Sequence, residues 1–540
     1  MRDLYYGDNL DVLREHIPDG SVDLVYLDPP FNSQRSYNLL FKSPGGQQSD
    51  AQITAFEDTW HWGGQAEREY DQLLHQPNTH VAEMMRAFRA FLGENDVMAY
   101  LVMMANRLLE LHRVLKSTGS LYLHCDPTAS HYLKIVLDGV FGTENFQNEI
   151  KWKRTHSHGD SRRRFGNVSD TILFFSKNKA FLFNRQHLPY SKDYIDKFYR
   201  HVDPGGRRYQ LVSLRSPNPR PNLVYEYKGY TPHRNGWAVS LEVMEQLDRE
   251  GRLYFPENKD GAIREKYYLD EMPGVAASDI WTDIDPISAH AAERLGYPTQ
   301  KPLALLQRII GASSNEGDVV LDPFCGCGTA VHAAELLKRQ WIGIDITHLA
   351  ISLIEKRLRT AFPGIGFEVH GTPKDYAGAV ELASIDKYQF QWWACSLVNA
   401  QPYQGKKKGA DRGIDGLIFF RDDDRDAKKI VVSVKGGENV GVAMVRDLVG
   451  VLEREQAEIG LFVTLSEPTQ PMIAEAAAAG FYEARAYKQK FPRIQILTVR
   501  GLLEGSERPE YINVDADLGH KRARRETTSH RGHVEMELER

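Results

Sequence analysis

The chain has little of what would place it in a membrane or in an oxidising compartment. Its 540 residues include four cysteines, whose spacing fits neither a disulfide framework nor a zinc site: Cys125, Cys325, Cys327 and Cys395. No apolar run approaches the length of a membrane span, and the N-terminus lacks the basic and then apolar pattern of a signal peptide. We therefore expect a cytoplasmic protein with no membrane partner, built of about two to four domains.

An excess of positive charge is also missing, because 67 Lys and Arg residues face 73 Asp and Glu residues, for a formal net charge of −6. An even spread of this charge would be unusual for a protein that binds nucleic acid. The basic residues are clustered, however. One cluster surrounds Trp152, His156 and His158 and is opposed within its stretch only by Asp160; it consists of Lys151, Lys153, Arg154, Arg162, Arg163 and Arg164. A solvated surface loop is the alternative, but we favour contact with nucleic-acid phosphates.

The tetrapeptide Asp28-Pro29-Pro30-Phe31 follows an apolar run from Val22 to Leu27, which predicts a strand that ends in a stiff loop. The exocyclic amine of a base is a weak nucleophile because its lone pair is delocalised into the ring. The Asp28 carboxylate and the Pro29 carbonyl could accept the two amine hydrogens and free that lone pair. Phe31 offers a flat face for a base swung out of its duplex. The alternative is an ordinary strand-ending turn.

A glycine-rich loop lies far downstream. A short apolar strand from Asp318 to Leu321 leads into Asp322-Pro323-Phe324-Cys325-Gly326-Cys327-Gly328-Thr329, and an alanine-rich helix follows. A second strand, from Trp341 to Ile346, carries Asp345 about 20 residues beyond the loop. In nucleotide-binding βαβ units the glycines let the backbone approach the ligand, and the acid accepts from ribose hydroxyls. The loop is not GxGxxG, so a dinucleotide is the weaker interpretation.

In this order the two loops resemble those of the permuted, β-group amino-methyltransferases of DNA. Three other segments carry the resemblance: Tyr6-Gly7-Asp8-Asn9-Leu10, the stretch from Leu123-His124-Cys125-Asp126 to Ile150-Lys151-Trp152, and Tyr297-Pro298-Thr299-Gln300-Lys301-Pro302. The resemblance covers roughly residues 1–155 and 275–375. It implies S-adenosylmethionine as methyl donor, and it implies a catalytic role for Asp28, Pro29, Pro30 and Phe31. It implies a donor site made by Asp8, Lys301, Pro302, Asp322, Phe324, Gly326, Gly328, Thr329 and Asp345.

The leading Asp28 resembles the adenine-N6 enzymes more than the cytosine-N4 enzymes, which usually have serine at this place. Methylation at cytosine C5 would need a nucleophilic cysteine in a Pro-Cys loop, and the sequence has none. RNA or protein amines are disfavoured, because this motif order with a large inserted domain belongs to DNA enzymes. Intact loops at Asp28 and Gly326 argue against a DNA-binding protein with an inactive methyl site. Cytosine N4 stays open as the alternative acceptor.

Methyltransferases of this order carry their target-recognition domain between the two core halves, which implies double-stranded DNA as the partner. The clearest non-helical stretch of this region is Arg215-Ser216-Pro217-Asn218-Pro219-Arg220-Pro221-Asn222. The sequence leaves open which side chains read bases. It also leaves open whether the chain forms a homodimer or works with a separate restriction subunit.

A further unit begins near residue 374. A helix from Tyr388 to Ala400 precedes predicted strands at Leu417–Phe420 and Ile430–Lys435, and a helix at Val445–Glu455 and a strand at Leu461–Thr464 follow. Asp415 enters the first strand and Lys435 ends the second. In metal-dependent nucleases such an acid holds Mg²⁺ and such a lysine helps to activate the attacking water. The segment resembles the Mrr-type restriction endonucleases, which implies Asp415 as a metal ligand and Lys435 as the catalytic lysine.

This segment departs from the nuclease pattern in one place. Ser433 stands where the pattern has Glu, Asp or Gln, and Gln391 stands where a glutamate could assist. A hydroxyl is a far weaker ligand for a hard cation than a carboxylate. Other acids could complete the site: Asp411, Glu438 or Glu453. Two hypotheses therefore stay open, a nuclease fold kept for DNA contact and a bifunctional restriction–modification enzyme that cleaves DNA with Mg²⁺.

These patterns predict an α/β chain whose core is a Rossmann-like, mostly parallel, doubly wound sheet, followed by an α/β restriction-endonuclease-like domain. Because both core loops leave the carboxyl ends of parallel strands, we expect Asp28 and Gly326 to face one cleft. The expected segments are a catalytic half at 1–155, a target-recognition domain at 156–285, a donor-binding half at 286–375, the nuclease fold at 376–515 and a disordered tail at 516–540.

Overall fold

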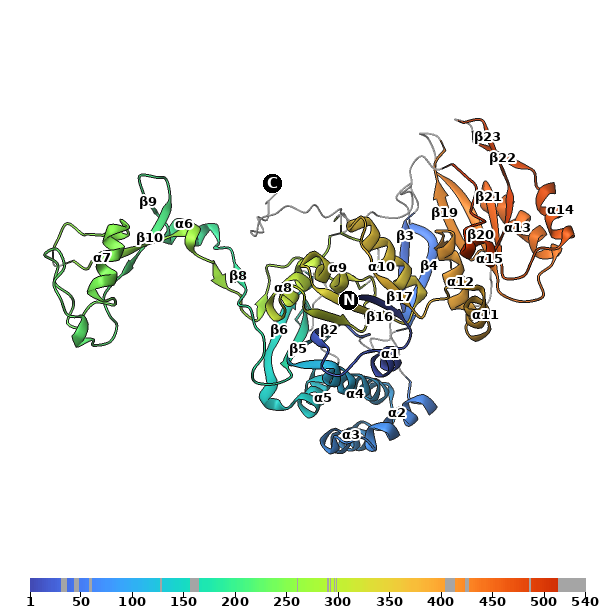
Figure 1. Cartoon of the computed structure of the whole chain (residues 1–540). Helices are drawn as coiled ribbons and strands as arrows, with labels where there is room; N and C mark the ends of the chain where they lie inside the picture. Colours follow the sequence, from blue (N-terminus) through green and yellow to red (C-terminus); the bar gives the residue numbers. More distant parts are fainter. Residues whose placement is uncertain are drawn as a thin grey trace. The chain divides into compact units, whose positions relative to one another are not determined.

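The computed structural model describes residues 1–30, 36–42, 48–57, 61–126, 129–155, 165–259, 261–288, 291, 293–295, 297, 299–403, 413–422, 427–484 and 487–512, with the backbone alone for 36–42 and 48–57. The chain divides into two compact units. The first comprises Met1–Asn184 and Asp279–Arg540, and the second comprises Arg185–Ser278. A nine-stranded sheet and a five-stranded sheet belong to the first unit (Figure 1).

The nine-stranded sheet is mostly parallel, as predicted. Its strands lie in the order β14, β6, β7, β5, β2, β15, β16, β1 and β17, and only β7 runs antiparallel to its neighbours. The strands are β1 (Arg2–Tyr6), β2 (Val22–Leu27), β5 (Leu115–Cys125), β6 (Phe146–Lys153), β7 (Ser169–Ser176), β14 (Ile280–Trp281), β15 (Val319–Asp322), β16 (Gln340–Asp345) and β17 (Glu368–His370). A separate hairpin joins β3 (Ser36–Lys42) to β4 (Gln48–Glu57).

Helices cover both faces of this sheet, which explains why its central strands are nearly continuous apolar runs. One face packs against α1 (Asn9–His16), α4 (Asp96–Val114) and α5 (Ser130–Phe141), with α2 (Gly64–Leu74) and α3 (Thr79–Leu92) outside them. The other face packs against α8 (Leu303–Ser313), α9 (Thr329–Leu336) and α10 (His348–Ala361). The two helical layers are visible on opposite sides of the strands in Figure 1. The sheet is therefore doubly wound.

The central pairing of the sheet positions the site. Strand β15 pairs in parallel with β2, with Val320 opposite Leu24 and Leu321 opposite Val25. Both strands therefore end at the same edge, next to each other. The loops that begin at Asp28 and Asp322 leave this edge together, although they lie far apart in the sequence.

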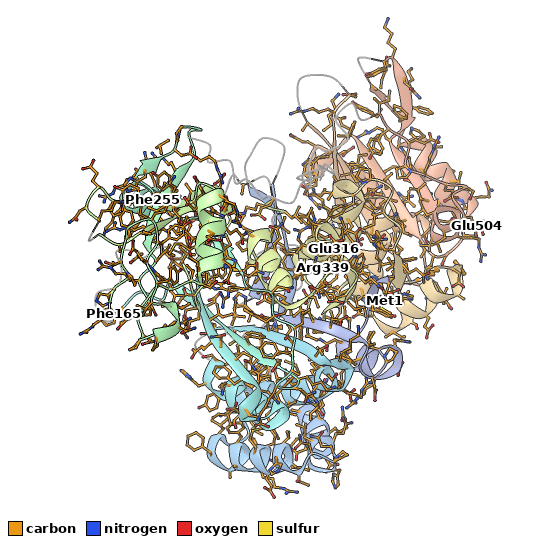
Figure 2. All side chains as sticks on the ribbon, turned by 60° about the vertical axis from the view of Figure 1, so that its left-hand side comes forward. Met1, Phe165, Phe255, Glu316, Arg339 and Glu504 are labelled. Atoms are coloured by element: carbon orange, nitrogen blue, oxygen red, sulfur yellow. The ribbon has the colours of Figure 1, made fainter. Side chains whose placement is uncertain are left out.

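The second unit, Arg185–Ser278, has its own small core. Its four-stranded antiparallel sheet, in the order β11, β12, β10 and β9, is formed by β9 (His201–Val202), β10 (Arg208–Ser213), β11 (Leu253–Tyr254) and β12 (Arg264–Tyr268). The fully buried Trp237 and the buried Met244 lie in the core, and Phe255, labelled in Figure 2, packs against it. The remaining elements are β8 (His187–Leu188), α6 (Lys192–Phe198), α7 (Leu241–Arg249) and β13 (Val275–Ala276).

This unit lies within the predicted target-recognition domain at 156–285, whose bounds stay a prediction. Strands β7 and β14 fall inside the predicted range but pair with β6 in the nine-stranded sheet. Backbone pairing with the core, rather than loop-rich composition, sets the boundary. No composition signal marks the change, because β7 reads as an ordinary apolar strand.

The C-terminal domain contains the five-stranded sheet, in the order β18, β19, β20, β21 and β24. The predicted strands and helices are confirmed with small shifts at their ends, and helices again cover both faces. The helix α15 ends at Glu504, labelled in Figure 2. The elements are α11 (Tyr376–Ile385), α12 (Lys387–Leu397), β18 (Gln401–Pro402), β19 (Gly416–Phe420), β20 (Lys428–Lys435), α13 (Val442–Glu455), β21 (Ile459–Thr464), α14 (Gln470–Ala478), β22 (Phe481–Ala484), β23 (Gln489–Pro492), β24 (Ile494–Thr498) and α15 (Val499–Glu504).

Two further predictions concern membrane-spanning helices and the C-terminal tail. Among the described residues, none of the helices combines the length and the apolarity that a bilayer crossing requires. The tail predicted at 516–540 lies outside the described residues.

Candidate active site

A cavity of about 610 Å³ opens at the carboxyl ends of β1, β2, β15 and β16. Its walls include the loop after β2, with Asp28, Pro29 and Pro30, and the loop after β15, from Asp322 to Cys327. The predicted convergence of these two loops is therefore observed. Other lining residues come from neighbouring loops and strand ends: Gly7, Asp8, Asn9, Thr299, Gln300, Lys301, Asp345, Ile346 and Thr347.

The Asp28 carboxylate is poised for a ligand. Its Oδ2 forms an ion pair with the Lys301 ammonium, and the two side chains are only 15% and 10% exposed. Its Oδ1 is buried and has no hydrogen-bond partner among the described residues. An unsatisfied buried acceptor costs about 1–3 kcal/mol, so a ligand hydrogen that reached Oδ1 would recover that free energy. The predicted stacking residue Phe31 lies outside the described residues.

Lys301 lines the cavity, and its observed partner is the Asp28 carboxylate. Sequence pattern alone does not indicate this pairing, since the two residues lie 273 positions apart. Its neighbour Pro302 is not among the lining residues; it precedes the first turn of α8, where a proline costs no helix hydrogen bond. The donor-binding role of Pro302 stays a prediction, and its observed place is the start of α8.

The glycine-rich loop is held by Asp345. The Gly326 amide donates to Asp345 Oδ2 at 2.9 Å, and the Thr347 amide and hydroxyl both donate to Oδ1 at 2.9 Å. Gly326 has a φ of +50°, and a Cβ there would lie 3.3 Å from the Tyr297 ring, so glycine is required. Burial raises the pKa of Asp345 to about 6 despite these hydrogen bonds. Asp345 thus shapes the loop as well as lining the cavity.

Gly328, predicted as a donor-binding residue, has a packing role in the structure. It lies in the left-handed region with a φ of +72° and directly precedes α9. A Cβ there would lie 2.8 Å from the Ile354 side chain, and the residue does not line the cavity. Gly328 therefore lets α9 and α10 pack closely, whereas Phe324, Gly326 and Thr329 face the cavity as expected.

The cavity is strongly acidic. Its lining residues include five aspartates, which outnumber the two cations Arg107 and Lys301: Asp8, Asp28, Asp322, Asp345 and Asp386. Burial raises the pKa of Asp322 well above its usual value, and the nearby Asp28 and Asp345 charges raise it further. Asp8 and Asp28 are ion-paired with Arg107 and Lys301, so the excess of acid comes from Asp345, Asp386 and, beside a cation, Asp322, and it disfavours phosphate groups. This argues against the dinucleotide alternative.

Arg107 is a site residue that the sequence analysis missed. Its guanidinium donates to Asp8 Oδ1 and Oδ2 at 3.0 and 2.8 Å, and Asn9 in turn donates to the Pro323 carbonyl at 2.8 Å. These bonds tie the loop after β1 to the loop after β15. The signal in the sequence is that Arg107 interrupts the apolar pattern of α4. In the structure its side chain is only 5% exposed, which is rare for an arginine without a partner.

A buried hydrogen-bond chain that the sequence analysis also missed begins at the cavity. Tyr26 lines the cavity, and its hydroxyl lies 3.1 Å from His124 Nδ1. His124 Nε2 lies 3.1 Å from Asp170 Oδ2, and Asp170 Oδ1 pairs with Arg154 Nε at 2.8 Å. The signal for it was His124 within the apolar run of β5. The chain fixes the Tyr26 ring beside the Asp28 loop.

The structure describes only half of the predicted basic cluster. Lys151 donates to the Thr171 hydroxyl at 2.8 Å and contacts Glu149, and Arg154 pairs with Asp170. These two cations are thus partly compensated, whereas Lys153 ends β6. The other three members lie outside the described residues: Arg162, Arg163 and Arg164.

The predicted nuclease pair lies at one edge of the five-stranded sheet. The Lys435 ammonium approaches Asp415 Oδ2 to 3.9 Å, and the same oxygen accepts from the Val434 amide at 2.6 Å and the Ser433 hydroxyl at 3.4 Å. Among the described residues, three potential ligands cluster only at Asp3, Glu368 and His370, not around Asp415. Asp411 lies outside the described residues.

Two parts of the sequence match known families. Residues 22–356 match the family described as DNA methylase, and residues 382–508 match the family described as restriction endonuclease. The first match contains the cavity loops from Asp28 to Asp345, and the second contains Asp415 and Lys435. The two matches confirm a DNA methylase part and a restriction-endonuclease-like part.

Three curated relatives share the first part. The chain is 34% identical over 261 residues to the type II methyltransferase M.EcaI of Enterobacter cloacae, covering 48% of this chain and 57% of that protein. It is 26% identical over 350 residues to the Mod subunit of the type III restriction-modification enzyme StyLTI of Salmonella typhimurium, covering 62% and 50%. It is 24% identical over 359 residues to the DNA adenine methyltransferase YhdJ of Escherichia coli, covering 66% and 83%.

The chain spans about half the length of M.EcaI and of the StyLTI Mod subunit. The family match at residues 22–356 makes up more than half of the 540 residues. It also contains the loops after β2, β15 and β16 that line the cavity, but not the loop after β1 or the lining residues between 386 and 392. The chain therefore belongs to the DNA methylase family.

Proposed function

We propose that the chain transfers a methyl group from S-adenosylmethionine to the N6 amine of adenine in double-stranded DNA, at a specific sequence. The observation that carries the proposal is the single cavity shared by the Asp28 loop and the Asp322–Thr329 loop. One loop offers an acceptor for an amine, and the other offers close backbone approach to a nucleoside. Methyl transfer needs both in one space.

The cavity fits the donor. S-adenosylmethionine carries a sulfonium and an ammonium group and supplies an electrophilic methyl group when bound. The excess of aspartates over cations in the lining suits such a ligand, and Asp322 is buried with a raised pKa, so a nearby cation would stabilise its ionised form. The proposed donor contacts are the loop from Phe324 to Thr329, Asp345 for the ribose and the region of Asp8 for the adenine.

The proposed role of Asp28 follows from its two oxygens. Lys301 holds Oδ2, which fixes the carboxylate and leaves Oδ1 to accept a hydrogen of the target amine. The Pro29 carbonyl accepts the other hydrogen, so the nitrogen lone pair turns toward the methyl group. Oδ1 can also accept the proton that the amine releases as the new N–C bond forms. Most of the acceleration comes from positioning, because the departing thioether needs no acid.

Adenine is the proposed base, with cytosine N4 as the alternative. The leading Asp28 supports adenine, and YhdJ is by name an adenine methyltransferase. The proposed DNA contacts are the basic cluster from Lys151 to Arg164 and the unit at 185–278, where a flipped-out base must be selected. A separate restriction subunit is a proposed partner, since one relative is by name a Mod subunit.

The test is transfer of tritiated methyl from S-adenosylmethionine to unmethylated duplex DNA, followed by mass spectrometry of the digested nucleosides. We expect N6-methyladenine as the product. N4-methylcytosine would select the alternative base, and transfer to neither base from a protein that binds the donor would refute the proposal.

A second candidate function is Mg²⁺-dependent DNA cleavage by the C-terminal domain. The specific observation that favours it is the approach of Lys435 to Asp415 at the edge of the five-stranded sheet. The serine at position 433 weighs against it, because a hydroxyl replaces the carboxylate that the pattern expects, and no group of three potential ligands surrounds Asp415 among the described residues. Incubation of supercoiled DNA with Mg²⁺ and the purified protein tests it directly.

A further inference from the structure

The helix α12 contributes to two structures at once. It belongs by sequence to the C-terminal domain, yet residues at its start and along one side line the acidic cavity: Asp386, Tyr388, Gln389 and Trp392. The expected methyltransferase motifs include none of these residues. The wall of the cavity thus comes partly from a domain whose family match is to restriction endonucleases.

The local sequence explains how one helix can line the cavity and also pack into the core of the C-terminal domain. Asp386 caps α12 by accepting from the Tyr388 and Gln389 amides at 2.9 and 3.0 Å. Gln389 and Trp392, three residues apart, share one side of the helix and face the cavity. The buried Phe390 and Trp393 share another side and pack into the core of the C-terminal domain.

The cavity side of α12 is anchored to α10. The His348 amide, in the first turn of α10, donates to the Gln389 side chain at 3.2 Å. Trp392 packs against a small apolar cluster that contains Tyr297, Cys327 and Leu349. Cys327 belongs to the glycine-rich loop, and Tyr297 is the ring that lies over Gly326. Trp392 therefore touches the same layer that shapes the proposed donor site.

The far side of α12 reaches the candidate nuclease site. The Cys395 thiol lies 3.5 Å from the Asp415 carbonyl, and a Cβ on Gly436, next to Lys435, would lie 2.8 Å from the Phe390 ring. Displacement of α12 from the cavity would therefore disturb packing next to both sites. A packed helix of this kind moves as a unit rather than one side chain at a time.

We propose that α12 is the outer wall of the methyl-donor site, with Gln389 and Trp392 as binding residues, so that donor binding and docking of the C-terminal domain stabilise each other. The proposal rests on the proposed function, because it takes the ligand of the cavity to be S-adenosylmethionine. If docking of α12 raises the donor affinity by some factor, thermodynamic linkage requires that the donor raise the docking equilibrium constant by the same factor.

The first test uses the full chain without mutation and S-adenosylhomocysteine as a non-reactive probe. Backbone amide exchange of the peptide spanning 386–398 is measured by mass spectrometry with and without the probe. We expect at least a fivefold slowing in this peptide, comparable to that of the glycine-rich loop and absent from α13. Slowing in the glycine-rich loop alone would overturn the proposal and leave the donor site intact.

The second test uses three variants and isothermal titration with the same probe. We expect Trp392→Ala to weaken binding about tenfold and Trp392→Phe to restore most of it, because a ring of similar flatness refills the cluster. Gln391→Ala is the matched control on the same helix, since Gln391 does not line the cavity, and its affinity should equal that of the wild type. Thermal unfolding of each variant checks that it is folded.

The outcomes separate the two claims. Wild-type protein that binds no probe would remove the proposed function and this inference together. Wild-type protein that binds, with a folded Trp392→Ala variant of equal affinity, would overturn the inference alone. Weakened binding by Trp392→Ala with normal binding by Gln391→Ala supports it.

Discussion

The Asp28–Lys301 pair and the Asp415–Lys435 pair both lie at strand ends, and they differ in what surrounds the acid. Asp28 pairs with Lys301, and its other oxygen is buried beside a cavity of about 610 Å³, with no partner among the described residues. Asp415 lies 3.9 Å from Lys435, but the oxygen that faces the lysine already accepts from the Val434 amide. The first acid keeps an acceptor oxygen for a ligand, and the second uses its lysine-facing oxygen to hold its own backbone.

The comparison shows that a motif is necessary but not sufficient for a site. Both pairs follow their family patterns at the residues that the patterns name. The methyltransferase cavity adds supporting acids from several loops, whereas the nuclease edge has Ser433 where a carboxylate is expected. We infer that the chemistry of the second site, unlike that of the first, depends on a ligand that its own strand does not supply.

The largest expected effect is on Asp28. Asp28→Ala should lower methyl transfer to DNA by about a thousandfold, because the variant loses the acceptor that orients the amine. Donor affinity should change little, since the glycine-rich loop is untouched. Single-turnover transfer of tritiated methyl measures the rate, and titration with S-adenosylhomocysteine measures the affinity. Lys435→Ala is the control from the other pair and should methylate normally; a matching loss in that variant would erase the distinction between the two sites.

The second prediction concerns the nuclease pair. If the C-terminal domain cleaves DNA, Lys435→Ala should reduce Mg²⁺-dependent nicking of supercoiled DNA by about a hundredfold. Ser433→Glu should raise nicking at low Mg²⁺, because it restores the carboxylate that the pattern expects. Gel assays over a range of Mg²⁺ concentration measure both variants. Equal nicking by the wild type and Lys435→Ala would remove Lys435 from any catalytic role.

The third prediction concerns the basic cluster. Replacing Arg162, Arg163 and Arg164 with alanine should weaken DNA binding by about tenfold or more. It should also flatten the dependence of binding on salt, by about 0.9 in the log–log slope for each DNA phosphate that the variant no longer neutralises. Fluorescence anisotropy with a labelled duplex at several salt concentrations measures the slope. An unchanged slope would show that these residues are a solvated loop.

The smallest expected effect is a pH dependence of donor binding. Burial raises the pKa of Asp345 to about 6, so this carboxylate becomes protonated in the free protein as the pH falls below 6. A protonated Asp345 accepts ribose hydroxyls poorly, so affinity should fall by up to about tenfold per pH unit below 6 and stay level above 7. Titration of S-adenosylhomocysteine between pH 5 and 8, with Asp345→Asn as the pH-insensitive control, measures it. A flat wild-type profile would contradict the assigned role.

Much of the site could be predicted from sequence, because its residues follow strands directly. Strand β2 begins and ends as predicted. The order strand, glycine loop, helix, strand places Gly326 and Asp345 at the carboxyl ends of neighbouring parallel strands. Neighbouring parallel strands then bring Asp28 to the same edge. These inferences need only local pattern and the general rule for open α/β sheets.

The rest depends on packing between distant segments. The partner of Lys301 lies 273 residues away, and nothing near Lys301 in the sequence indicates a carboxylate. Gly328 and Pro302 belong to conspicuous motifs, yet one serves helix packing and the other starts a helix. The sequence likewise does not indicate that Trp392 lines the cavity. The buried side of the same helix, with Phe390 and Trp393, already accounts for its apolar pattern.

The most direct test of the central claim is a genome-wide map of modified bases after expression in a methylation-free bacterium, read by single-molecule sequencing. We predict N6-methyladenine in one sequence context for the wild type and none for Asp28→Ala. Modification that persists in the Asp28→Ala strain, or a wild-type genome with no modified base despite measured donor binding, would contradict the assignment of this cavity as a DNA amino-methyltransferase site.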